Sequence, residues 1–273
     1  MNNKNQVYQF KDQLNDHLEL PVFPPQRIVS LVPSITELLF DLGLENRIMG
    51  VTKFCVHPRG KCKSKEIIGG TKNIHLDKID RIQPDLIIAN KEENEKNQVE
   101  NLKKSYPVWV SDVDHFKDAL EMISTIGSLT GSGDMAKNMI REIESAFTQI
   151  PVPKNKIKVA YLIWQKPYMA VGSHTFIHDM LQRAGFENIF ADAIRYPEIS
   201  LEILNQRRPE IIFLSSEPYP FKEKHQREFE QLLPNSKILL VDGEMFSWYG
   251  SRMLISGKYF GDLQEKCTKT IRA

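Results

Sequence analysis

Two segments of this chain repeat one pattern, and the repeat limits how the chain can fold. Residues 76–89 read LDKIDRIQPDLIIA, residues 201–214 read LEILNQRRPEIIFL, and the two align without a gap. A second pair, Gly43-Leu-Glu-Asn46 and Gly185-Phe-Glu-Asn188, follows an apolar helical run in each half. The spacing is too long for a solenoid and predicts two related α/β lobes. Proteins built from two such lobes commonly bind a ligand in the crevice between them.

Composition and charge exclude several classes of protein. The formal net charge is +1, so no basic field favours nucleic acid, and no apolar run approaches the length of a membrane span. The three cysteines, Cys55, Cys62 and Cys267, lack CxxC spacing and allow one disulfide at most. We therefore expect stability to come from packing of two hydrophobic cores.

The amino terminus bears on where the protein works. Residues 1–9 are polar, with no basic segment leading into an apolar core, so we expect no signal peptide in this sequence. Two interpretations follow: the protein stays in the cytoplasm, or an export leader has been removed.

Strand and helix patterns alternate along the chain, which predicts an α/β fold with mainly parallel sheets. A helix with a Ser34–Glu37 capping box should follow the first strand and end at Gly43. The predicted strands are 27–31, 48–51, 86–89 and 108–110 in the first half, and 158–163, 168–171, 211–213 and 238–241 in the second.

Residues 134–149 have apolar side chains at helical spacing, so one long, rigid helix should join the two Rossmann-like lobes. We predict an N-terminal lobe over 1–130, a connecting backbone helix over 131–151 and a C-terminal lobe over 152–273. A helical connector should limit how far the crevice opens.

Three motifs with a known chemistry are better explained as ordinary structure. Residues 131–136 fit G-x-G-x-x-A but follow a helical run, whereas a dinucleotide-binding loop follows a strand. Cys55, His57 and Cys62 supply too few ligands for a structural zinc site, and no third ligand accompanies His174 and His178. We therefore expect no metal site, no intrinsic cofactor, no catalytic residues and no enzyme.

The informative residues lie just after the carboxyl ends of the predicted strands, where parallel α/β sheets bind ligands. Aromatic residues are dense at these positions in the second half, which favours a flat, largely apolar ligand with a few polar groups. The predicted ligand-binding residues are Ser34, Phe54, Asn90, Trp164, Tyr196, Phe246, Trp248 and Arg252.

Several motifs in order resemble one family. RIVSLVPSITE over 27–37, Gly50-Val51, the 76–89 segment, the stiff middle helix and Asp242-Gly…Arg252 are similar to the helical-backbone substrate-binding proteins of ABC importers for cobalamin, haem and iron–siderophores. The cobalamin-binding branch is the most similar, and the resemblance runs from about residue 9 to the end. It implies a periplasmic or cell-surface monomer that binds a metal chelate and no nucleic acid.

The resemblance also implies roles for individual residues. Phe54, Trp164 and Tyr196 match aromatic residues that contact cobalamin in the family, whereas Thr71 and Asn90 replace two others, which leaves room for a different chelate. Asp77 and Glu202 match the acidic residues that dock on permease arginines. An alternative from another class is a leaderless cytoplasmic protein that uses a corrinoid or chelate for sensing, storage or an enzymatic task.

Overall fold

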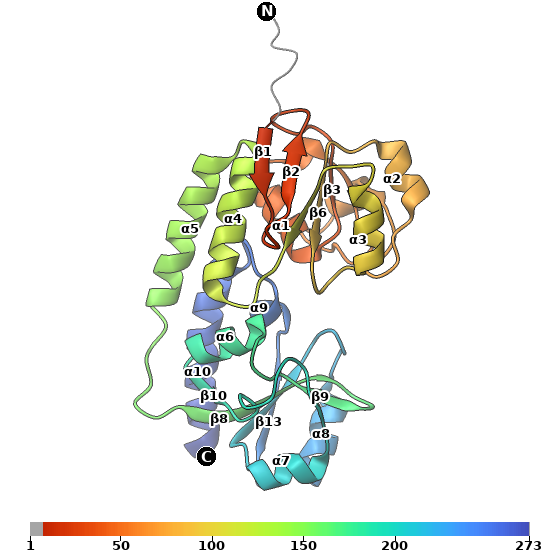
Figure 1. Ribbon diagram of the computed structural model, residues 1–273. Helices are drawn as coiled ribbons and strands as arrows, with labels where there is room; N and C mark the ends of the chain where they lie inside the picture. Colours follow the sequence, from red (N-terminus) through yellow and green to blue (C-terminus); the bar gives the residue numbers. More distant parts are fainter. Residues whose placement is uncertain (1–7, 273) are drawn as a thin grey trace, which may run out of the picture. The chain divides into compact units, whose positions relative to one another are not determined.

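The chain divides into two units, each built around its own α/β sheet (Figure 1). The computed structural model describes residues 8–272. The first unit holds the chain up to Val113, Lys117–Arg141 and Tyr249–Ser251, and the second holds Asp114–Phe116, Glu142–Trp248 and the chain from Arg252. Residues 1–7, which carry most of the signal-peptide expectation, lie outside the described residues.

The first unit contains a five-stranded sheet in the order β5-β4-β3-β6-β7, in which every pairing is parallel. Its central strands are buried on both faces, as expected for a parallel sheet covered by helices. The strands are β3 (Ile28–Ser30), β4 (Ile48–Val51), β5 (Glu66–Ile67), β6 (Leu86–Asn90) and β7 (Val108–Ser111). The helices are α1 (Pro33–Asp41), η1 (Glu45–Arg47), η2 (Cys62–Ser64), α2 (Leu76–Ile82), α3 (Lys96–Lys103) and α4 (Phe116–Thr130).

An antiparallel hairpin that the sequence analysis did not predict precedes this sheet. It consists of β1 (Tyr8–Lys11) and β2 (His17–Leu20). The hairpin is tied to β7 because the Trp109 indole donates to the Lys11 carbonyl at 3.1 Å. It therefore extends the first unit beyond the predicted strands.

The second unit contains a six-stranded mixed sheet in the order β11-β9-β8-β12-β13, with β10 also paired to β8. Strands β8, β10, β12 and β13 are parallel, whereas β9 and β11 add an antiparallel edge. The strands are β8 (Ile157–Trp164), β9 (Tyr168–Ala170), β10 (Phe186–Asn188), β11 (Glu198–Ile199), β12 (Ile211–Ser215) and β13 (Lys237–Val241). The helices are α6 (Phe176–Arg183), α7 (Leu201–Arg207), α8 (Glu223–Leu232), α9 (Glu244–Ser247) and α10 (Met253–Arg272).

The sequence repeat is also a structural repeat. Helices α2 and α7 each have seven residues and end in a left-handed residue, Gln83 at φ 50° and Arg208 at φ 49°. A proline and an acidic residue follow in both copies. The Asp85 carboxylate accepts from the Gln26 and Arg27 amides at 2.7 and 2.8 Å. The Glu210 carboxylate accepts from the Lys158 amide at 2.8 Å. In both units the acidic residue thus fixes the start of the neighbouring parallel strand.

The predicted capping box of the first helix is wrong. Helix α1 begins at Pro33, its N-cap is Val32, and no side chain caps it. Proline is favoured at the first helical position because its fixed φ suits the helix and its missing N–H would have no partner there. Ser34 therefore lies inside the first turn, while Gly43, at φ 74°, follows the helix end as predicted.

The predicted connecting helix is present as α5 (Gly133–Thr148), and the division between the units falls within it. In the first unit a Cβ added at Gly127 of α4 would lie 2.4 Å from the Ala136 Cβ of α5. In the second unit a Cβ at Gly257 of α10 would lie 2.8 Å from the Ala146 carbonyl oxygen of α5. Glycine thus lets a neighbouring helix pack closely against each half of α5.

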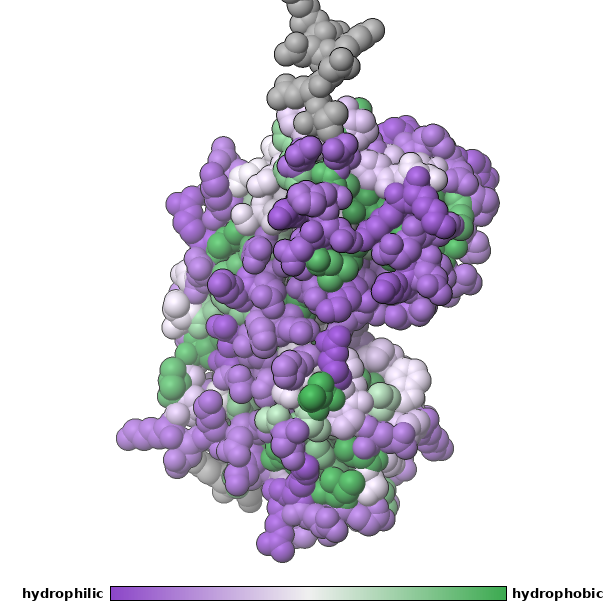
Figure 2. Space-filling model, viewed as in Figure 1, coloured by the Kyte–Doolittle hydropathy of each residue, from purple (hydrophilic) through white to green (hydrophobic). Residues whose placement is uncertain are grey.

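The visible surface is mainly hydrophilic, with small separate hydrophobic patches (Figure 2). Within residues 8–272 no helix combines the length and apolar character needed to cross a lipid bilayer.

Candidate functional site

In the first unit, the loop after β4 presents an aromatic ring to solvent. Phe54 is 50% exposed, and the Lys53 ammonium lies 5.0 Å from its ring centroid. Gly70 lies close to the ring, since a Cβ there would be 3.3 Å from Phe54 Cε2. A half-exposed phenylalanine in this position can bind a flat apolar surface, and the lysine adds a positive charge beside it.

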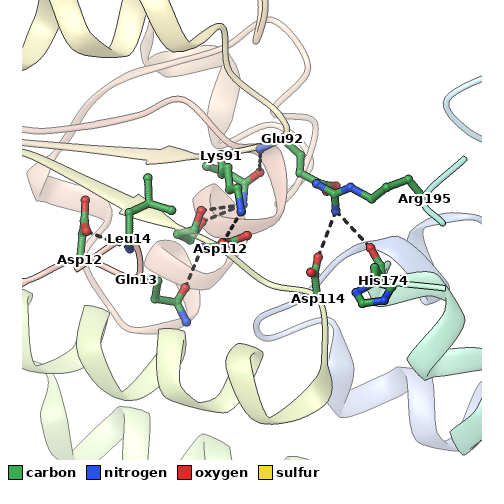
Figure 3. Close-up of polar contacts among 11 residues, drawn as sticks. Asp12, Gln13, Leu14, Lys91, Glu92, Asp112, Asp114, His174 and Arg195 are labelled. Carbon is green, nitrogen blue, oxygen red and sulfur yellow. Dashed lines mark hydrogen bonds and ion pairs between the residues drawn. The ribbon is translucent and has the colours of Figure 1, made fainter. Parts of the chain in front are cut away.

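Asn90, at the end of β6, uses its side chain to hold the following turn. Its amide nitrogen donates to the carbonyl and the hydroxyl of Ser111 at 3.1 and 3.0 Å. Its carbonyl oxygen accepts from the amides of Glu92 and Glu93 at 2.8 and 2.9 Å. The buried Asn90 amide therefore positions residues 91–93, and Lys91 next to it pairs with Asp112 at 2.6 Å (Figure 3).

Ser34 is buried in the first turn of α1, beside Tyr249 of the same unit. Burial raises the pKa of Tyr249 well above its ordinary value, and the nearby carboxylates of Glu93 and Glu92 add to this, whereas the Ser34 and Ser111 hydroxyls oppose it. The Tyr249 phenol is thus neutral.

In the second unit, Trp164 ends β8 at a register shift against β9 and is 39% exposed. Its indole meets the Tyr219 ring edge to face, with the centroids 5.7 Å apart. The Tyr219 hydroxyl donates to the buried Gln165 side chain at 2.9 Å and lies 3.2 Å from His225 Nε2. Trp164 is therefore an accessible aromatic surface with an ordered support behind it.

Tyr196 is half-buried in the loop before β11, directly after Arg195. Arg195 has a left-handed backbone, and its guanidinium donates to Asp114 Oδ1 at 3.2 Å and to the His174 carbonyl at 3.1 Å (Figure 3). These contacts fix the loop that carries Tyr196. The sequence gives no sign of this ion pair because its partners are far apart in the chain.

Phe246 was predicted to contact ligand, and the structure corrects this. Its side chain is fully buried and packs against Tyr161 and Phe260, with centroids 5.1 and 4.7 Å apart. These partners belong to β8 and α10 of the same unit, so Phe246 is a core residue.

Trp248 and Arg252 are largely buried in a local cluster of the second unit. The Arg252 guanidinium carbon lies 4.9 Å from the Trp248 ring centroid, and Arg252 also pairs with Glu244 at 2.8 Å. Both side chains are less than a tenth exposed, so little of their surface is accessible to a ligand.

In the part of the chain that the structure describes, nothing supports a metal site. Among residues 8–272, no group of three or more His, Cys, Asp or Glu side chains has the arrangement of a metal site. Cys55, Cys62 and Cys267 are free and buried. Burial, with Cys55 nearby, raises the pKa of the Cys62 thiol to about 11, which disfavours the thiolate that a metal needs.

His174 and His178 do not lie on one helix. Helix α6 starts at Phe176 with Thr175 as its N-cap, so His174 precedes the helix. The Asn188 amide lies 3.1 Å from His178 Nδ1, donates to the Val171 carbonyl at 2.9 Å and accepts from the Phe190 amide at 3.1 Å. Because these bonds orient the amide, its NH₂ group faces His178, whose Nδ1 must be an acceptor. Burial lowers the pKa of His178, which agrees with a neutral ring.

Asp77 and Glu202 both lie in the first turn of their helices and are exposed. Asp77 pairs with Arg81 at 2.8 Å, one turn along α2. The Ser200 hydroxyl lowers the pKa of Glu202. Both carboxylates complement the positive helix end, and both remain accessible to a partner.

Comparison with known proteins identifies the family. A family model described as "Periplasmic binding protein" matches residues 28–236. The chain belongs to this family. A vitamin B12-binding protein of Vibrio parahaemolyticus is 26% identical over 197 residues, covering 70% of this chain and 71% of the relative. Another, from Pectobacterium atrosepticum, is 23% identical over 244 residues, covering 86% of each chain.

Solved structures agree with the fold of the periplasmic binding protein family. The periplasmic vitamin B12-binding protein BtuF of Vibrio cholerae has a TM-score of 0.75 at 21% identity, covering 90% of this chain and 99% of its own. CeuE of Helicobacter pylori has a TM-score of 0.81 at 16% identity, covering 97% and 91%. At such identities the likeness shows the fold alone, and it confirms the predicted fold class.

Proposed function

We propose that this periplasmic binding protein is the substrate-binding component of an ABC importer for a metal chelate, with cobalamin as the first candidate and haem or a ferric siderophore next. The observation that carries the proposal is the similarity to vitamin B12-binding proteins over 70% of the chain. We further propose that the protein works as a monomer outside the cytoplasmic membrane.

The side chains at the carboxyl ends of the strands support a flat ligand. Phe54 and Trp164 each end or follow a buried strand and remain substantially exposed, and Tyr196 is half-buried in a tethered loop. We propose that these three are the main ligand contacts, with Ser34 as a polar contact. Asn90 acts by positioning its turn, while Trp248 and Arg252 support the loop that they share.

Absorbance titration tests the ligand class directly. Purified protein is mixed with cyanocobalamin, haemin or a ferric siderophore, and the visible spectrum and the bound fraction are measured after gel filtration. We expect cyanocobalamin to bind one to one. Failure of all three chelates to bind would overturn the proposed function.

Replacement of Trp164 tests the site. Loss of an anchoring aromatic typically weakens binding by about 1–3 kcal/mol, so Trp164→Ala should raise the Kd about 5- to 150-fold. Val152→Ala is the matched control, because Val152 is 92% exposed in the segment before β8. If Trp164→Ala binds as tightly as the control, the exposed aromatics only cap the sheet.

We also propose that Asp77 and Glu202 dock on the permease. They occupy equivalent positions of the structural repeat and are exposed, so exchanging both for alanine should leave ligand affinity unchanged and weaken binding to reconstituted permease. In the control variant, Asp134 and Glu265, two other exposed acidic residues in helices, are replaced with alanine. This double variant has the same change in net charge. Equal docking of the two double variants would assign Asp77 and Glu202 to helix stabilisation alone.

A further inference from the structure

Tyr219, which packs against the Trp164 indole, also forms hydrogen bonds with the two residues that flank Trp164. Tyr219 contacts the strand end on both sides of Trp164: its amide donates to the Ile163 carbonyl at 3.2 Å, and its hydroxyl donates to Gln165 Oε1 at 2.9 Å. These bonds hold the residues on either side of Trp164 in place, and the Tyr219 ring packs edge to face against the indole itself.

The tyrosine is in turn fixed by His225, a buried residue in the first turn of α8. The Lys222 amide donates to His225 Nδ1 at 2.9 Å, so Nδ1 carries no hydrogen. A neutral imidazole then carries its hydrogen on Nε2, which lies 3.2 Å from the Tyr219 hydroxyl oxygen and donates to it. The hydroxyl hydrogen of Tyr219 is thereby directed to Gln165 Oε1. In these three hydrogen bonds, each donor and each acceptor is therefore assigned.

Electrostatics and packing agree with this assignment. Burial lowers the pKa of His225, with the cations Lys224 and Lys222 acting in the same direction and Glu228 opposing them. Phe221 packs against both Tyr219 and His225, with centroids 4.8 and 5.5 Å apart. The imidazole is therefore neutral near pH 7 and enclosed by aromatic rings, so its orientation is fixed.

We propose that Tyr219 and His225 are positioning residues that hold the Trp164 indole in the orientation in which it contacts the ligand. The inference rests on the proposed function, in which Trp164 is a ligand contact. A fixed aromatic loses no rotational freedom on binding, so the network raises affinity without touching the ligand. The hydrogen bonds of Tyr219 and His225 would thus contribute to ligand affinity indirectly, through Trp164.

The test uses protein labelled with 5-fluorotryptophan. Fluorine NMR gives a resonance for each of Trp109, Trp164 and Trp248, and Trp164→Phe assigns the one of interest. Tyr219→Phe keeps the ring and removes the hydroxyl bonds, so it should shift or broaden the Trp164 resonance and leave that of Trp109 unchanged. His225→Leu should do the same, and His225→Gln, which restores a donor, should recover the native spectrum in part.

The control is Tyr106→Phe, which removes a hydroxyl bond of 2.7 Å to Asp80 in the other unit and should leave Trp164 unchanged. Titration with cyanocobalamin should show a Kd raised about 3- to 10-fold by Tyr219→Phe, the effect of one lost hydrogen bond. A native Trp164 resonance and native affinity in Tyr219→Phe would overturn the inference.

The two proposals fail in different ways. If Trp164→Phe and Trp164→Ala leave the affinity unchanged, the proposed ligand site is wrong, whatever the NMR spectra show. If Trp164→Ala weakens binding but the Tyr219 and His225 variants do not, only the positioning role is wrong. A variant whose second unit fails to fold loses the native resonance of Trp248, which lies in that unit, and Tyr219→Phe then remains as the milder test.

Discussion

Two glycines one turn apart in α10 should respond in opposite directions to the same substitution. Gly257 is buried, and a Cβ there would lie 2.8 Å from the carbonyl oxygen, 2.9 Å from the carbonyl carbon and 3.2 Å from the Cβ of Ala146. At Gly261 the nearest atom to an added Cβ is Pro151 Cδ at 3.7 Å, an ordinary contact. Both glycines have helical backbones, so packing is the only relevant difference between them.

The expected magnitudes follow from this difference. Alanine is favoured over glycine inside a helix by about 1 kcal/mol, so Gly261→Ala should raise the free energy of unfolding by about that amount. Gly257→Ala has the same gain but forces α10 away from the backbone of α5, and overpacking of this kind costs about 1–3 kcal/mol. The two variants should therefore differ by about 2 kcal/mol, with Gly257→Ala less stable than the native protein.

Urea denaturation followed by circular dichroism measures both variants under one set of conditions. The slope of the free energy of unfolding against urea concentration should be the same in both variants. A shift of the midpoint then reports a change in stability. If Gly257→Ala is stabilised as much as Gly261→Ala, α10 does not pack against α5 as closely as the structure indicates.

Two further predictions concern buried and paired side chains. The folded-state pKa of His178 is lowered, mainly by burial, so the neutral ring contributes stability that is present above about pH 6.5 and is lost as the pH falls towards the folded pKa. His178→Gln should flatten the fall in melting temperature below pH 6.5, whereas the exposed His17→Gln should leave it unchanged. Asp85→Ala removes the acceptor of two backbone amides and should cost about 1–2 kcal/mol, and Glu210→Ala, which frees one amide, should cost less; equal losses would contradict the hydrogen-bond assignment.

The sequence predicted the buried parallel strands well because their signal is local. Strand β4 occupies 48–51 as predicted, and α5 differs from its prediction by one residue at each end. Strand β5 was missed because it has two exposed residues. The β1–β2 hairpin was missed because β1 has no buried residue and only alternate residues of β2 are buried. In these elements the tertiary pairing, and not a local pattern, determines the structure.

The ligand site was harder to predict because accessibility is a tertiary property. Phe246 and Trp164 are both aromatic residues that follow a predicted strand, yet one is fully buried and the other 39% exposed. The difference arises from the rings around Phe246, among them Tyr161 of β8 and Phe260 of α10. His225 gave no signal at all, since a histidine in a helical first turn looks like an ordinary surface residue until Tyr219 is placed beside it.

The position of residues 249–251 in the first unit bears on how that unit folds during translation. They belong to the first unit, where Gly250 has φ 108° and its Cβ position lies 3.4 Å from Leu38 Cβ of α1. Helix α1 leaves the ribosome long before residues 249–251, which pack against it. The amino-terminal unit therefore cannot complete its packing during translation, and a chain cut before Tyr249 lacks part of the unit that was synthesised first.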